Sequence, residues 1–100
     1  MFVRLFTSAI DPNDLAEVRR IFEEDIRPVF ESFAACESME LLLGTDRNAG
    51  GLVDAAALSR WKTHEGLTSA IESRAVAESM VRILPFLKLE PVIRMFEIVE

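Results

Sequence analysis

The residues that could do chemistry are few and lie far apart in the sequence. The chain has a single His, His64, a single Cys, Cys36, and a single Trp, Trp61, and it contains no Tyr. Metal sites need several His, Cys or carboxylate ligands at short spacing, so we expect no metal ion. No His lies near Cys36 to activate it, and we expect that thiol to act as a small apolar side chain. Gly50 and Gly51 join two expected strands and do not open a helix, so no phosphate-binding loop or other cofactor site is expected.

Five charged residues fall on expected strands and could form one site. They are three arginines and two acids: Arg4, Arg60, Arg94, Glu40 and Asp54. If these residues share one face of a sheet, they can form a paired network, because buried charges need partners. The alternative is a site for an anion or carboxylate, in which Arg acts as a two-pronged donor.

Composition excludes several classes of protein. The 100 residues carry 17 acidic and 11 basic side chains, a net charge of −6, and 50% of them are hydrophobic. Nucleic-acid surfaces need clustered Lys and Arg, so no nucleic acid partner is expected. No stretch approaches the about twenty apolar residues that span a bilayer, so no membrane partner is expected. A lone cysteine fits a reducing compartment, and we expect a cytoplasmic protein with one domain over residues 1–100.

The first half of the chain begins with an alternating apolar segment, which predicts a strand over residues 2–10. Asp11 can cap a helix, and Pro12 suits its first position. Apolar residues then recur every three or four positions as far as Phe33, which predicts one long amphipathic helix. Pro28 lacks an N–H group and is expected to kink this helix or end it early.

The second half predicts two more strands, a helix and a final strand. Thr63 can cap the second helix and Ser73 can restart it before Pro85. The predicted ranges are a strand over 39–43, a hairpin loop over 46–51, a strand over 52–61 and a strand over 88–99.

The order β-α-β-β-α-β predicts a ferredoxin-like α+β fold, in which a four-stranded antiparallel sheet carries two helices on one face. Both alternating sets of side chains in the first strand are apolar, Val3 and Leu5 as well as Phe2 and Phe6. The last strand has the same property. A sheet with two apolar faces must bury both of them, and the helices can pack against only one. We therefore expect a homodimer through the open sheet face, giving a dimeric α/β barrel.

The run Ala55-Ala56-Ala57-Leu58-Ser59-Arg60-Trp61-Lys62-Thr63-His64-Glu65-Gly66-Leu67 resembles the third strand and second helix of the antibiotic-biosynthesis-monooxygenase-like family, which belongs to the dimeric α+β barrel superfamily. Members include cofactor-free oxygenases of aromatic polyketides and haem-degrading enzymes. The resemblance implies a pocket between sheet and helices with Trp61 near its wall. A large ring there can stack on a flat ligand, or it can simply fill the core.

Catalytic partners of the family do not carry over. Haem-degrading members pair the Trp with an Asn on the first strand and a His on the second helix. This chain has Thr7 and Ser8 on the first strand and Ile71 at the helical position. His64 lies at the start of the helix, where we expect an exposed residue. The quinone-forming oxygenases use Tyr and Asn around the substrate, and the chain has no Tyr. The catalytic residues are therefore unknown, and the candidate substrate-binding residues are Trp61, Thr7, Arg60 and Ile71.

Two functions remain open. The first is a small cofactor-independent monooxygenase that binds a flat apolar or aromatic molecule between sheet and helices. The second is a non-catalytic dimeric module for ligand binding or assembly, which the sparse pocket chemistry favours.

Overall fold

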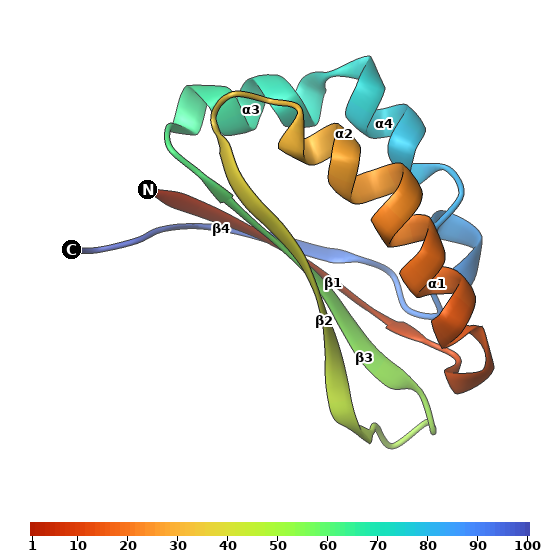
Figure 1. The fold of residues 1–100 in the computed structure, drawn as a ribbon. Coiled ribbons are helices and arrows are strands. Elements are labelled where there is room, and N and C mark those ends of the chain that lie inside the picture. Colours follow the sequence, from red (N-terminus) through yellow and green to blue (C-terminus); the bar gives the residue numbers. More distant parts are fainter.

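The computed structural model describes residues 1–100 as one sheet with helices on one face (Figure 1). The chain runs β-α-β-β-α-β, and the sheet order is β2-β3-β1-β4 with every pair antiparallel. This is the α+β ferredoxin-like fold that the sequence predicts. The elements are β1 Phe2–Ile10, α1 Leu15–Ile21, α2 Arg27–Glu31, β2 Cys36–Arg47, β3 Val53–Trp61, α3 His64–Glu72, α4 Arg74–Met80 and β4 Val92–Glu97.

The first helical layer is continuous through Pro28, whereas the sequence predicted a kink or an early end. Between α1 and α2 the backbone forms a π-helical turn, Phe22–Ile26, in which the N–H of Arg27 donates to the carbonyl of Phe22. Pro28 then occupies the first turn of α2, where its missing N–H leaves no additional gap. The wider π-helical turn thus accommodates Pro28, and the helix continues along the sheet.

The expected caps form. Asp11 accepts a hydrogen bond from the Asn13 N–H at 2.8 Å, and the Thr63 hydroxyl accepts one from the Gly66 N–H at 3.0 Å. Ser73 ends α3 and caps α4 by accepting from the Val76 N–H at 3.2 Å. None of the helices combines the length and the hydrophobicity that a membrane span requires.

The β2–β3 hairpin is longer than its sequence suggested, because β2 extends from Cys36 to Arg47 with two irregularities in its register. Asn48 closes the loop by accepting from the N–H groups of Gly50 and Leu52 at 2.9 and 3.0 Å. Gly51 has φ of +78°, a conformation that glycine adopts without strain. The hairpin projects beyond the helices at one end of the sheet (Figure 1).

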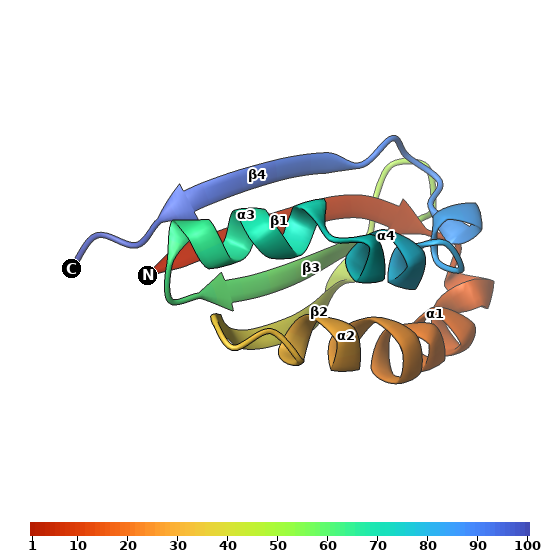
Figure 2. The same cartoon turned by 90° about the horizontal axis from the view of Figure 1, so that it is seen from above.

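The core lies between the sheet and the helices. Figure 2 shows α1 and α2 running along the β2 side of the sheet and α3 crossing near β1, while β4 lies at an edge beyond the helices. Both faces of β4 are accordingly exposed, including Ile93 and Met95 on the helix side and Val92 and Phe96 on the open side. One flank of the core therefore has no helical cover.

Gly66 provides a test of the packing between α3 and the segment before β2. A Cβ at this position would collide with the Cβ of Ala35 and lie 2.9 Å from the Thr63 hydroxyl. Gly→Ala within a helix normally stabilises by about 1 kcal/mol. We expect Gly66→Ala to lower the free energy of unfolding instead, by about 1–3 kcal/mol, as overpacking does. Urea denaturation of Gly66→Ala and of the double variant Gly66→Ala/Ala35→Gly measures this. Partial recovery in the double variant identifies the Ala35 collision as the cause, and an unchanged or higher midpoint in Gly66→Ala would contradict the packing.

Candidate functional site

The register between β1 and β3 determines which side chains face the helices. Phe2 lies opposite Trp61, Arg4 opposite Ser59, Phe6 opposite Ala57, Ser8 opposite Ala55 and Ile10 opposite Val53. The first and last pairs contain core residues that pack beneath the helices. Because side chains alternate along a strand, all five pairs line the helix side of the sheet. The intervening residues point to the open side.

A small apolar cavity lies in the middle of this layer, where the sheet carries small side chains. Its volume is about 40 Å³, which holds a few water molecules. Ala55 and Ala57 of β3 leave the space, and Phe22 and Ile26 of the π-helical turn form the opposite wall. A π-helical turn is rare and often occurs at functional sites.

The lining of the cavity is almost entirely apolar. Twelve of its 13 residues are hydrophobic, and the exception is Ser8. The Ser8 hydroxyl already donates a hydrogen bond of 2.7 Å to the Leu89 carbonyl. Met80, Ile83 and Leu87 close the end of the cavity that lies after α4. The cavity thus offers shape and apolar contact but no free acid or base.

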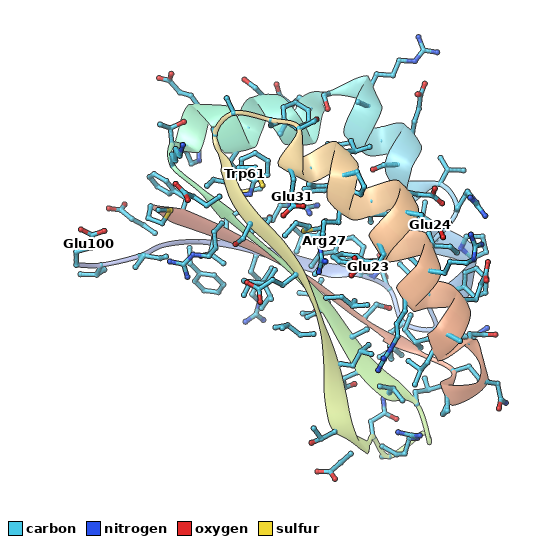
Figure 3. The ribbon with its side chains drawn as sticks, in the orientation of Figure 1. Glu23, Glu24, Arg27, Glu31, Trp61 and Glu100 are labelled. Carbon is cyan, nitrogen blue, oxygen red and sulfur yellow. The ribbon has the colours of Figure 1, made fainter.

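Trp61 is completely buried and lies beyond this cavity. Its ring packs against Phe30 and Phe33 at centroid distances of 6.3 and 6.4 Å. Figure 3 shows it between the sheet and the helices. The indole N–H has no hydrogen-bond partner. Trp61 is therefore a major filler of the core, and its role in ligand binding stays a prediction.

The other three candidate residues do not gather around Trp61. Thr7 points to the open side, where its hydroxyl donates to the Val92 carbonyl at 3.3 Å. Arg60 is exposed on the same open side, opposite Val3. Ile71 is half-buried on α3 and packs against the core. Thr7 and Arg60 thus lie on the open side of the sheet and Ile71 lies on the helix side, and their part in binding also stays a prediction.

The charged residues on the strands do not form one set. Arg60, Arg94, Glu40 and Asp54 lie on the open side, and none of them forms an ion pair within the chain. Arg4 lies on the opposite side, because it occupies an alternate position of β1 opposite Ser59 and Met95. The expectation that Arg4, Arg60 and Arg94 belong to one network is therefore wrong, because the sheet separates Arg4 from the other two arginines.

Arg4 is the unexpected residue of the helix side. It is only 7% exposed, makes no ion pair, and its Nε has no hydrogen-bond partner. Its guanidinium lies 5.6 Å from the centroid of the Phe6 ring. Burial lowers the pKa of Arg4 from its ordinary value, because desolvation disfavours the charged form. Only the pairing register of the strands shows that Arg4 lies on the helix side of the sheet, opposite Ser59.

The remaining reactive groups form no site. His64 begins α3 and contacts Phe2 edge-to-face at a centroid distance of 5.5 Å. No group of three or more His, Cys, Asp or Glu side chains is arranged to hold a metal ion. Cys36 is partly buried, and burial, followed by the charge of Glu31, raises the pKa of its thiol.

This raised pKa gives Cys36 a testable reactivity. We expect iodoacetamide at pH 8 to alkylate Cys36 more slowly in the folded protein than in urea, because less of the thiol is ionised and less is exposed. The folded state holds the thiol proton more tightly than the unfolded chain. The free energy of unfolding therefore falls as the pH rises above the ordinary thiol value of 9.0, and it falls less in Cys36→Ala. Equal alkylation rates in the two states would contradict the environment described here.

Comparison with known proteins identifies the fold. No family model matches the sequence, and no curated protein matches it. A candidate antibiotic biosynthesis monooxygenase from Nitrosomonas europaea superposes with a TM-score of 0.77 at 7% identity over 100% of both chains. Another from Bordetella bronchiseptica gives a TM-score of 0.75 at 14% identity, covering 99% of this chain and 97% of its own. A Mycobacterium tuberculosis protein gives 0.71 at 13% identity, covering 99% and 95%. At these identities the likeness shows the fold, and the chain has the ferredoxin-like fold of proteins named antibiotic biosynthesis monooxygenases, as the resemblance around Trp61 predicts.

Proposed function

We propose that the protein binds a flat apolar small molecule between its sheet and helices and oxidises it with O2 without a cofactor. The apolar cavity between β3 and the π-helical turn is the observation that carries this proposal. Ala55 and Ala57 leave room at positions where larger strand residues would close the core. Several proteins with the same fold carry the name antibiotic biosynthesis monooxygenase, which favours the oxidative reading.

The reaction that fits such a cavity needs little from the protein. When O2 converts an activated CH2 group of the ligand to a carbonyl, one oxygen atom enters the ligand and the other leaves as water. The ligand supplies all four electrons and both protons of that water. Excluding bulk water and holding the ring are then the main contributions of the site. The lining of the cavity is suited to both, and no residue is assigned as acid or base.

Binding a ring requires the cavity to enlarge. Its volume of about 40 Å³ is below that of an aromatic ligand. The wall most able to move is the one after α4, where Met80 is a flexible side chain and only a short 3-10 turn, Leu84–Phe86, precedes β4. We propose that this segment moves outward when the ligand enters.

The second candidate function is a non-catalytic dimeric module for ligand binding or assembly. The absence of a free acid or base in the cavity lining favours it, because Ser8 is already engaged with Leu89. Turnover with O2 separates the two functions, since both require the same cavity but only one consumes oxygen.

We also propose that the protein is a homodimer through its open sheet face. The centre of this face is apolar, with Leu5 opposite Leu58. In the same row, Arg94 lies on the β4 edge and Glu40 on the β2 edge. A two-fold axis parallel to the strands would bring Arg94 of one protomer over the partner's Glu40, and the reverse. The open face is therefore complementary to itself in both charge and polarity. A cytoplasmic location remains part of the proposal and is supported by the lone cysteine.

Filling the cavity tests the ligand site. We expect Ala57→Leu to weaken the binding of 1-naphthol at least about tenfold, which corresponds to ~1.4 kcal/mol, because the larger side chain occupies the space of the ring. Isothermal titration measures the affinity, and an oxygen electrode measures O2 consumption with anthrone, a flat substrate whose activated CH2 group can become a carbonyl, corrected for its spontaneous oxidation. The matched control is Ala77→Leu, which adds the same group on the exposed side of α4.

Three results are distinguishable. Binding and catalysed O2 consumption that are both lost only in Ala57→Leu support the monooxygenase. Binding without catalysed O2 consumption supports the non-catalytic module. Equal binding to both variants would place the ligand elsewhere and overturn the cavity as the site.

Charge reversal tests the dimer. We expect Arg94→Glu and Glu40→Arg each to raise the dimer dissociation constant, because each places like charges opposite one another, and we expect the double variant to recover most of the loss. The effect of each exposed pair is about 0.2–1 kcal/mol, and the two-fold axis supplies two pairs. Sedimentation equilibrium measures the constants, with Leu58→Glu expected to give monomers and Leu84→Glu, on an exposed turn, as its control. A wild-type monomer, or a double variant no better than the single ones, would contradict this arrangement.

A further inference from the structure

Four buried side-chain polar atoms have no hydrogen-bond partner, and three of them belong to neighbouring residues on the helix side of the sheet; the fourth is the Ser38 hydroxyl on β2. The three neighbours are the Arg4 Nε, the Ser59 hydroxyl and the Trp61 indole N–H, and the exposed fractions of these residues are 7%, 1% and 0%. Buried polar groups in folded proteins almost always have hydrogen-bond partners. Three exceptions in adjacent positions therefore require a common explanation.

The strand register brings these groups together. Arg4 and Ser59 are direct cross-strand partners, so their Cβ atoms are about 5 Å apart. Trp61 follows Ser59 by two residues and occupies the diagonal position relative to Arg4. The Nε of Arg4 and the indole N–H can only donate hydrogen bonds, whereas the Ser59 hydroxyl can donate one and can also accept. None of the three bonds to another, and because all three can donate, an external acceptor could pair with each member of this donor cluster.

No hydrogen bond within the chain reaches any of these three groups. Arg4 forms no ion pair or side-chain hydrogen bond within the chain. A partner protomer on the open face could not supply one, because the sheet itself lies between that face and Arg4. Burying the Arg4 Nε without a partner is unfavourable, and replacing a buried charged side chain by an apolar one commonly stabilises the fold. An unpaired buried polar group therefore calls for an explanation, which can be a functional role or an ordered water or ion.

The donor cluster continues the cavity along the sheet. Phe6 and Ala57 line the cavity and form the row next to Arg4 and Ser59. The Arg4 guanidinium lies 5.6 Å from the Phe6 ring centroid, so it adjoins the end of the cavity. The flank beside Arg4 is also open, because its β4 partner Met95 is 47% exposed where no helix covers that strand (Figure 2). A ligand could thus place an apolar ring in the cavity and a polar head against the donors.

We propose that Arg4, with Ser59 and Trp61, anchors an anionic oxygen of the ligand, so that the substrate class is a flat apolar molecule bearing a carboxylate or an ionised phenol. The inference rests on the proposed function, because it names the ligand of the same cavity. A guanidinium and an anionic oxygen form a charge-assisted hydrogen bond, which gains strength where water is excluded. Arg4 is a binding residue in this scheme, and it also holds the negative charge of a phenolate next to the site where O2 would react.

Paired probes test the anchor. 1-Naphthoate and 1-naphthamide share a ring system and differ in charge, and so do ionised 4-nitro-1-naphthol and 1-nitronaphthalene. Isothermal titration of the full chain is expected to show at least about tenfold tighter binding of an anionic probe than of its neutral partner, a factor that corresponds to ~1.4 kcal/mol. The pair with the larger ratio identifies the carboxylate or the phenolate as the preferred head group.

Variants assign the preference to the cluster. Arg4→Met is expected to abolish the anion preference while leaving the affinity for 1-naphthamide within about twofold, and Ser59→Ala to reduce the preference in part. Arg4→Lys keeps the charge but loses the Nε donor and is expected to be intermediate. The control Arg74→Met removes an exposed arginine of α4 and is expected to change neither affinity. Arg4→Met is also expected to raise the melting temperature of the unliganded protein, which would fall if Arg4 had only a structural role.

The failures of the two proposals differ. The wild-type protein could bind neutral and anionic probes with equal affinity, and Arg4→Met could leave both affinities unchanged. This result would keep the cavity as the binding site but overturn the anchor. The three donors would then be satisfied by internal water only. Binding of no probe by the wild-type protein would overturn the cavity and the anchor together. A lower melting temperature of Arg4→Met with an unchanged anion preference would assign Arg4 to the structure and overturn its role as an anchor.

Discussion

The antiparallel register between β1 and β3 is the constraint on which the rest of this structure depends. It pairs Phe2 with Trp61 and Ile10 with Val53 at the two ends of the central strands. Because the side-chain period of a strand is two residues, a slip of one position would move every core residue of one strand to the open face. The buried Trp61, with Phe30 and Phe33 packed on it, makes such a slip very unfavourable. The same register that buries Trp61 also forces Arg4 and Ser59 into the layer beneath the helices.

The space in that layer results from two local features of the chain. β3 supplies Ala55 and Ala57 on its helix side, which are small for positions at the centre of a sheet. Opposite them, the helix widens into a π-helical turn just before Pro28. A regular α-helix with larger strand residues beneath it would close this gap and gain apolar contact area. The cavity is thus a departure from efficient packing on both of its sides, and this departure supports the proposed ligand site.

Much of the fold could be predicted from the sequence, because the signals are local. Asp11, Thr63 and Ser73 cap helices as their residue types suggest, and the order of the strands follows from the pattern of apolar residues. Pro28 could not be placed correctly, since a proline can be accommodated by a π-helical turn that has no signature in the sequence. The site was harder still. Arg4, Arg60 and Arg94 all lie on strands, and only the register between strands reveals that Arg4 faces the other way.

The two faces of β1 divide the proposed functions between them. Leu5 and its neighbours on the open side offer an apolar surface with charges at its edges, which suits a second copy of the chain. Arg4 and Phe6 on the helix side adjoin an apolar cavity, and the proposed anionic ligand would supply the acceptor that the Arg4 Nε lacks. In the proposed dimer, association on the open face would stiffen β1, which carries Arg4 on its other face. Dimer formation would therefore hold Arg4 in position without any direct contact to it. The strength of a hydrogen bond depends on position more steeply than that of an apolar contact. Loss of the dimer would therefore weaken the binding of an anionic ligand more than the binding of its neutral analogue.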